Sequence, residues 1–164
     1  QFTVFRRRNI AFIFQNYNLI PILNAYENII MPVELDGNRV NVRYVEEVAG
    51  LLSLTDRLEY MPGNLSGGQQ QRAAIARALV TKPAIVLADE PTGNLDSRTT
   101  MEVLKLMQKI VREHNQTLVM VTHDNHLATY ADRIFHIIDG KIVKIEENHQ
   151  RAGEETEDRE GKAE

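Results

Sequence analysis

The sequence contains no cysteine. Without thiols the chain cannot form a disulfide scaffold, a thiolate zinc site or a cysteine nucleophile. It also lacks an apolar run approaching the roughly 18–20 residues that a transmembrane helix needs. The N-terminal residues do not follow a signal-peptide pattern, because the charges of Arg6, Arg7 and Arg8 come after the short apolar stretch, and there is no initiator methionine. We therefore expect a chain that begins partway into a longer gene product.

An excess of basic residues is also missing. The 164 residues carry a formal net charge of −4, most of which lies in the acidic segment 149–164. This balance argues against a protein that neutralises DNA phosphates along a broad basic face, so we predict no nucleic-acid partner. The hydrophobic share of 43% is ordinary for a globular protein, and the length predicts about one domain.

Hydrophobic periodicity predicts alternating strands and helices after a largely helical first half. Predicted strands are 9–15, 84–88, 117–121, 133–138 and 141–145, and predicted helices are 25–31, 42–52, 66–79, one starting near Ser97, and 124–130. Buried strands that alternate with helices indicate an α/β fold with a parallel sheet, and Asp139-Gly140 predicts an antiparallel C-terminal hairpin. The polar tail from about residue 147 has no periodicity, and we expect it to be disordered.

Two adjacent carboxylates, Asp89 and Glu90, directly follow the apolar run 85–88. Such a pair suits phosphoryl chemistry, in which Asp89 would hold Mg²⁺ directly or through water and Glu90 would polarise an attacking water. Ligands bind at the carboxyl ends of parallel strands, which is where these residues are expected to lie. The alternative is a strand end with ordinary surface acids, and the pair alone does not decide between the two.

A second motif, Ser66-Gly67-Gly68-Gln69, opens a predicted helix. Two glycines let a backbone approach a ligand closely, and the free N–H groups and dipole of the helix N-terminus attract anions. For these four residues alone, a serine cap after a glycine turn is the simpler explanation. The fifteen-residue string 65–79 is far more specific.

Three further motifs say little individually. Residues 93–96 (Gly-Asn-Leu-Asp) read as a turn with a helix cap, His123 is a lone histidine after a strand, and Gln15 leaves a strand. His123 and His126 could suggest a metal pair, but no further ligand cluster accompanies them.

In this order and spacing, the five motifs together resemble the ATP-binding cassette (ABC) transporter ATPases over residues of about 4–146. The resemblance implies ATP and Mg²⁺ as cofactors and a P-loop NTPase fold. Its implied catalytic residues are Glu90, His123 as the switch histidine, and Gln15 of the Q-loop; its metal residues are Asp89 of Walker B and Gln15. Its implied cofactor-binding residues are Ser66, Gly67, Gly68 and Gln69 of the signature, and Asp96 of the D-loop.

The resemblance also divides the chain. It implies the end of an N-terminal core portion over residues 1–15, a helical signature subdomain over 16–80, a RecA-like core over 81–147 and a tail over 148–164. The residues at 14–20 and 89–97 are similar to those of the family branch that exports macrolides and releases lipoproteins. The implied partners are a membrane-spanning permease and a second ATPase subunit in a homodimer, at the cytoplasmic face of the cell membrane. The implied cargo is a drug, peptide or lipoprotein.

One element of the family is missing from this sequence: no G-x-x-x-x-G-K-[ST] motif occurs, so the phosphate-cradling Walker A loop is absent. We therefore expect a partial P-loop fold that is inactive alone. We also expect part of the sheet to present uncovered apolar surface, which favours a non-native dimer or a swapped arrangement.

Two other interpretations remain open. The chain could be a truncated, non-enzymatic cassette that only binds a partner. It could also be a fragment of a DNA-repair-type ABC ATPase, although the stretch 15–65 is too short and too broken by prolines for the long coiled coil of those proteins. The basic cluster at residues 6–8 is expected to lie on a solvated strand edge.

Overall fold

The computed structural model describes residues 2–148, with side chains from Val4 onward. Its chain forms two compact units, residues 1–121 and 122–164, each of which is described here by itself. The first unit contains α1 (Phe2–Asn9), β1 (Ile10–Phe14), α2 (Ala25–Leu35), α3 (Val42–Leu51), α4 (Gly67–Leu79), β2 (Ile85–Asp89), α5 (Ser97–Glu113) and β3 (Thr117–Val121). Two short 3₁₀ turns, Thr55–Arg57 and Pro62–Asn64, connect α3 to α4.

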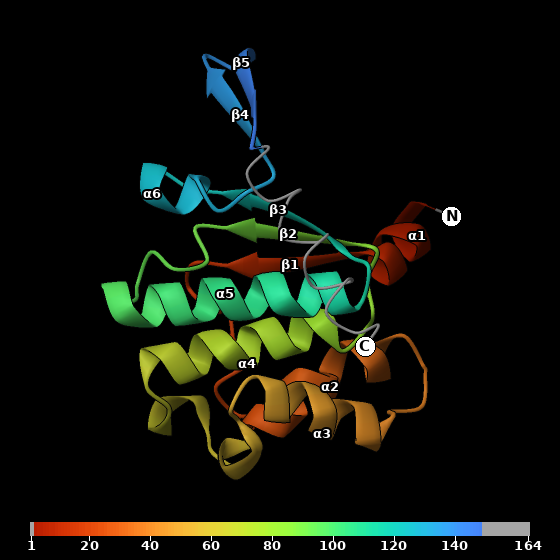
Figure 1. Ribbon diagram of the computed structural model, residues 1–164. Coiled ribbons are helices and arrows are strands. Elements are labelled where there is room, and N and C mark those ends of the chain that lie inside the picture. Colours follow the sequence, from red (N-terminus) through yellow and green to blue (C-terminus); the bar gives the residue numbers. More distant parts are fainter. Residues whose placement is uncertain (1, 149–164) are drawn as a thin grey trace, which may run out of the picture. The chain divides into compact units, whose positions relative to one another are not determined.

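The sheet of the first unit is parallel, with the order β1-β2-β3. The register pairs Phe14 with Asp89 and Asp89 with Val121, so all three strands end at the same level. Figure 1 shows α4 and α5 stacked beside the sheet and α2 and α3 beyond them. The predicted α/β class with a parallel sheet is confirmed.

The two faces of the sheet differ in burial. Ala11, Ile13, Val86 and Ala88 are buried on the face that packs against α4 and α5. Opposite them, α5 presents buried side chains at helical spacing, namely Val103, Leu104, Met107, Ile110 and Val111. Each such side chain contributes about 1.5–3 kcal/mol when it leaves water. This face is the core on which the unit depends.

The other sheet face carries exposed apolar side chains, as the sequence predicted. Phe12 and Phe14 are 42% and 40% exposed, and their rings stack with centroids 5.9 Å apart. Ile85, Val119 and Val121 extend the same surface across the other two strands. The association that we expect from this surface stays a prediction.

Side-chain caps set where the helices begin. Asn24 and Glu27 form a reciprocal capping box at the start of α2, and Ser66 and Gln69 form another at the start of α4. Each box satisfies backbone N–H groups that have no partner inside the helix. The predicted start of the helix at Ser66 is therefore confirmed, with Ser66 as its cap.

A fully buried asparagine, Asn28 of α2, fixes the loop that precedes this helix. Its Oδ1 accepts the N–H of Ile20 at 2.7 Å, and its Nδ2 donates to the carbonyl groups of Ile20, Leu23 and Asn24 at 3.0–3.1 Å. One side chain thus replaces the water that these backbone groups would otherwise need.

The expected strand edge at the basic cluster is wrong, because residues 2–9 form helix α1. Arg7 and Arg8 both pair with Asp36, the residue after α2, whose side chain is largely buried. Burial of the Asp36 carboxyl raises its pKa, but the hydrogen bond from Arg8 and the charges of both arginines outweigh this effect and lower the pKa. Cations are also favourable in the last turn of a helix. The partner is distant in sequence, so no local pattern could identify it.

The end of helix α2 also differs from the prediction. Helix α2 continues through Pro32 to Leu35 instead of stopping at residue 31. Proline removes one helical hydrogen bond, and here the helix continues because Ile29 and Ile30 are buried in the core and Val33 packs against it. The N–H of Asp36 still reaches the carbonyl of Pro32.

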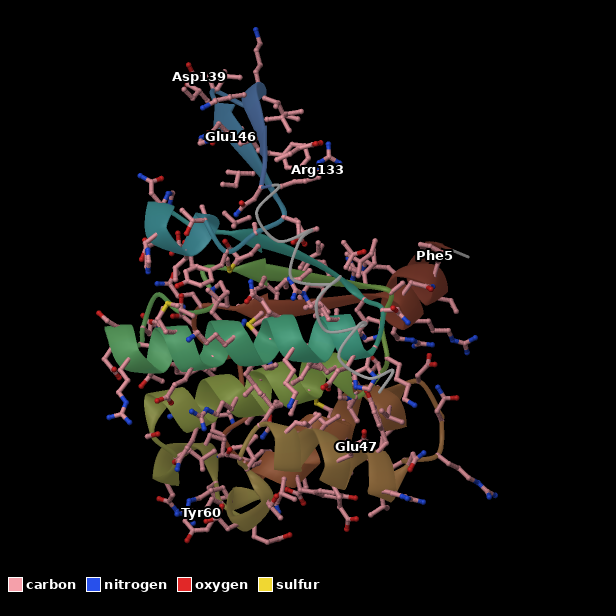
Figure 2. The ribbon with its side chains drawn as sticks, viewed as in Figure 1. Phe5, Glu47, Tyr60, Arg133, Asp139 and Glu146 are labelled. Atoms are coloured by element: carbon pink, nitrogen blue, oxygen red, sulfur yellow. The ribbon has the colours of Figure 1, made fainter. Side chains whose placement is uncertain are left out.

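The second unit contains α6 (Asn125–Ala128) and the antiparallel hairpin β4 (Arg133–Ile138) and β5 (Lys141–Glu147). Asp139, at the tip of the hairpin (Figure 2), and Gly140 both have positive φ, as a tight hairpin turn requires. Strand β5 is two residues longer than predicted. Asn148 is also ordered, since its N–H bonds to Asp132 and its side chain bonds to Thr129. The remaining tail, for which we expected disorder, lies outside the described residues.

The Asn28 contacts predict a large loss of stability on substitution. Asn28→Ala leaves one buried N–H and up to three carbonyl groups of the loop without a hydrogen-bond partner. We expect the free energy of unfolding to fall by about 2–4 kcal/mol, since each unsatisfied buried group costs about 1–3 kcal/mol and water re-enters in part. Urea denaturation measures the change, with Glu34→Ala on the exposed face of α2 as the matched control. Equal stability of the two variants would contradict this role.

Candidate nucleotide-binding site

The carboxyl edge of the sheet brings the first group of predicted residues together. Because Phe14 pairs with Asp89, Gln15 leaves β1 beside the end of β2. Asp89 is the last residue of β2 and is exposed. Glu90 follows in the left-handed region at φ 46°, and its N–H bonds to the carbonyl of Val121 at 3.0 Å. Non-glycine residues persist there only where surrounding contacts hold them, which is common at functional sites.

Gln15 also contacts the predicted D-loop, residues 93–96. A Cβ added to Gly93 would lie 2.6 Å from the Nε2 of Gln15, so the glutamine amide packs directly on the glycine backbone. From the next residue, Asn94 Nδ2 donates to the carbonyl oxygen of Gln15 at 3.0 Å. The structure therefore joins two motifs that lie almost 80 residues apart in sequence.

The predicted signature lies at the N-terminus of α4. The Oγ of Ser66 accepts the N–H of Gln69 at 3.3 Å, and Gln69 Oε1 accepts the N–H of Ser66 at 2.9 Å. Gly67 and Gly68 are the first residues of the helix, so their N–H groups precede its first intrahelical hydrogen bond. Gln69 is thus held by the cap, while the N–H groups of the glycines suit an anion.

The two signature glycines also permit close packing, which the sequence did not reveal. A Cβ on Gly67 would lie 3.0 Å from the hydroxyl of Tyr17, and a Cβ on Gly68 would lie 2.8 Å from Cγ2 of Thr99. Thr99 is the third residue of α5 and hydrogen-bonds Asp96, so it has little room to yield. Gly68 is therefore required where α4 meets α5, whether or not a ligand is bound.

A hollow of about 380 Å³ lies between the signature and the D-loop. It is lined by Ser66, Gly67, Gly68, Gln69, Arg72, Asn94, Leu95, Asp96 and Thr99. Arg72 donates to Glu102 at 3.0 Å, while its buried Nε has no hydrogen-bond partner within residues 2–148. The serine hydroxyl, the helix N–H groups and the arginine form a donor set that fits a phosphate group.

Asp96, at the rim of this hollow, is the N-cap of α5. It caps α5 by accepting the N–H groups of Arg98 and Thr99 at 3.1 Å, and it accepts the hydroxyl of Thr99 at 2.7 Å. The Thr99 hydroxyl, followed by the backbone N–H groups, lowers the pKa of Asp96 below its ordinary value. The carboxylate is thus kept ionised and oriented. Asp96 is the cap, as the turn-and-cap pattern of 93–96 predicted, while Ser97, which could also have capped this helix, is its first residue.

The remaining predicted residues are the metal residues Asp89 and Gln15, and His123. Asp89 and Gln15 adjoin the same strand ends, and no group of three or more metal-binding side chains occurs in the part of the chain that the structure describes. Mg²⁺ bound with a phosphorylated ligand needs only one or two protein ligands, so these two residues fit it. His123 belongs to the second unit, and its expected role as the switch histidine stays a prediction.

The contact between Gln15 and Gly93 leads to a direct test. Gly93→Ala places a methyl group where the Gln15 amide lies, and the amide must move because its side chain is the flexible partner. We expect the side-chain amide signal of Gln15 to shift in ¹⁵N NMR spectra while the fold is retained. Gly63→Ala is the control, since nothing lies within 4 Å of a Cβ at that position. An unchanged Gln15 signal in Gly93→Ala would refute the contact.

Comparison with known proteins agrees with this geometry. A family model described as ABC transporter matches residues 2–93. A macrolide export ATP-binding/permease protein MacB of Syntrophobacter fumaroxidans is 48% identical over 141 residues, which cover 84% of this chain and 20% of that protein. A lipoprotein-releasing system ATP-binding protein LolD of Geobacter metallireducens is 45% identical, with 85% of this chain and 63% of that protein covered.

Solved structures give the same result. The chain is similar to the ATP-binding cassette MJ0796 in a dimeric post-hydrolysis state bound to ADP and Pi, with a TM-score of 0.78 and 40% identity. The match covers 90% of this chain and 66% of that chain. The chain therefore spans less than two thirds of the length of these relatives. On the family model and these similarities, the chain belongs to the ABC transporter family and has the fold of its ATP-binding cassettes.

Proposed function

We propose that this chain is part of an ATP-binding cassette that couples hydrolysis of MgATP to export across a membrane. The observation that carries the proposal is the meeting of Gln15, Asp89 and Glu90 at one edge of the sheet, in contact with the D-loop. The similarity to proteins named for macrolide export and lipoprotein release supports a drug, peptide or lipoprotein as cargo. The subdivision into a helical part over 16–80 and a core over 81–147 belongs to the same proposal.

Each residue then has a role that follows from its place. Ser66, Gly67 and Gly68 donate hydrogen bonds to the terminal phosphate of a nucleotide held by a second cassette. MgATP supplies the phosphoryl group to be transferred and a metal ion that neutralises its charge. Glu90 orients the attacking water.

The other predicted residues complete this arrangement. Asp89 and Gln15 hold the metal, directly or through water. His123 donates to the transferring phosphate, and Asp96 links the two sites across the dimer. Donors fixed in advance cost little reorganisation when charge develops on the phosphate, which is the main source of catalysis in such sites.

The proposed partners are a second ATPase subunit and a membrane-spanning permease. The related cassette MJ0796 is dimeric in its solved structure. None of the helices within the described residues is long and apolar enough to cross a membrane. We place the protein as a peripheral subunit at the cytoplasmic face of the membrane, with the permease selecting the cargo.

The segment between Gln15 and Leu65 does not support the DNA-repair alternative. It contains only the short helices α2 and α3 and two 3₁₀ turns, where a coiled coil would need sustained heptads. The partner-binding alternative rests on the missing G-x-x-x-x-G-K-[ST] motif, and ATP hydrolysis by the intact protein would exclude it.

Nucleotide binding by the chain itself separates a signature-bearing fragment, whose activity belongs to the intact protein, from a cassette that holds nucleotide alone. We expect a fluorescent ATP analogue with Mg²⁺ to show no saturable binding to this chain, because the lysine and backbone cradle of Walker A are absent. Fluorescence anisotropy over a titration to millimolar concentration measures it. Saturable binding that Asp89→Asn abolishes would contradict this expectation and show that the chain holds nucleotide by itself.

The catalytic role of Glu90 is tested in the intact protein. Glu90→Gln keeps the side-chain shape but removes the carboxylate that polarises water. We expect steady-state ATP hydrolysis to fall by roughly 100-fold or more, with an ATP-bound dimer accumulating on size-exclusion chromatography. Glu113→Gln, an exposed acid near the end of α5, is the control and should retain full activity. A Glu90→Gln protein that stays monomeric with saturating ATP would refute the assignment.

A further inference from the structure

The turn after β1 has an unusual backbone. Tyr17 and Asn18 are successive non-glycine residues in the left-handed region, at φ 58° and 48°. Side chains other than glycine rarely adopt this conformation once, and two in a row need contacts from outside the turn. The N–H of Tyr17 bonds back to the carbonyl of Phe14 at 3.2 Å, which closes the turn on the strand but leaves the carbonyl groups of residues 17 and 18 pointing elsewhere.

An arginine of the signature helix holds those two carbonyl groups. Arg77 of α4 donates from Nη1 to the oxygen of Asn18 at 2.6 Å and from Nη2 to the oxygen of Tyr17 at 2.7 Å. Both bonds are short and charge-assisted, and the guanidinium is half-buried. The planar fork of arginine can span two successive carbonyl groups, whereas a lysine offers a single charged centre.

The same turn touches α4 a second time. The hydroxyl of Tyr17 lies 3.0 Å from the position of a Cβ on Gly67, so the ring reaches the first residue of the helix. Arg77 lies in the last turn of α4. Residues 17 and 18 are therefore fixed to both ends of the helix that carries the signature.

The D-loop also contacts this turn. Asn94 Nδ2 donates to the carbonyl of Gln15 at 3.0 Å and lies 3.4 Å from Oδ1 of Asn16. Gly93 packs against the side chain of Gln15. The turn 15–18 thus bonds both to α4 and to the D-loop.

We propose that Arg77 and Asn94 are positioning residues for Gln15, which hold the turn 15–18 against the signature helix and the D-loop. The role of Gln15 toward nucleotide rests on the proposed function, whereas the mechanical link rests on these contacts alone. A displacement of α4 is transmitted through Arg77 to the turn and then through Asn94 to residues 93–96. Arg77 does not line the hollow between the signature and the D-loop, so it can act on the turn without touching nucleotide.

Amide hydrogen exchange of this chain, without nucleotide, tests the link. In Arg77→Met we expect peptides covering 14–20 to exchange about tenfold faster, and peptides covering 90–97 severalfold faster, although Arg77 does not bond to the D-loop. Peptides covering 42–52 should be unchanged. Arg77→Lys, which can restore one carbonyl contact, should lie between wild type and Arg77→Met at 14–20. Arg43→Met, at an exposed position of α3, is the matched control.

Asn94→Ala tests the contact between the D-loop and the turn. Because Asn94 lies in an exposed loop, we expect this variant to fold. It should accelerate exchange at 14–20 without affecting 42–52. Unchanged exchange at 14–20 in both Arg77→Met and Asn94→Ala would overturn the proposal. So would faster exchange at 14–20 in Arg77→Met with no response at 90–97, because the turn would then not connect the helix to the D-loop. Faster exchange at 42–52 in both Arg77→Lys and Asn94→Ala would overturn it too, as a general loss of stability.

A kinetic measurement on the intact protein separates positioning from ligand contact. Arg77→Lys should lower kcat severalfold and leave KM for ATP unchanged, because Arg77 acts through the turn. A raised KM with unchanged kcat would assign Arg77 to nucleotide contact and overturn its positioning role. If the chain's exchange pattern holds but the intact protein shows no ATP hydrolysis, the proposed function fails and the mechanical link stands.

Discussion

The register of the parallel sheet is the constraint on which the site depends. Because Phe14, Asp89 and Val121 are paired across β1, β2 and β3, the residues that follow each strand start from the same edge. A shift of one position would turn Asp89 toward α4 and α5 and expose the buried alanines and valines. Burial of one sheet face thus fixes the chemistry at its edge. The separate motifs of the sequence become one site through this packing.

Much of this arrangement could be predicted from local patterns. The strands were recognisable because short apolar runs are bounded by residues such as Pro83 and Asp89. The helix at Ser66 was recognisable because a helix cap has a local sequence signature. Helix α1 was missed because Arg7 and Arg8 pair with Asp36, which follows the C-terminus of α2 and is distant in sequence. The end of α2 was missed because the buried neighbours of Pro32 outweigh its preference for a boundary.

The candidate site, too, could be predicted from the sequence only in part. Its charged and glycine-rich motifs were visible, but the contacts between them were not, since the partners of Gln15 lie almost 80 residues along the chain. The glycines show the difference most clearly. Their freedom to approach a ligand was inferred from sequence, whereas the structure places Tyr17 against Gly67 and Thr99 against Gly68. Such requirements are set by tertiary neighbours and leave no trace in spacing.

The buried amide of Asn28 has an evolutionary consequence. It recognises only backbone atoms of the loop from Ile20 to Asn24, so the path of the loop does not depend on which side chains the loop carries. Ile22, at the middle of this loop, is 81% exposed and contributes little to the core. Natural variation can therefore replace Ile22 freely and give the loop a different outer surface while its shape is inherited intact.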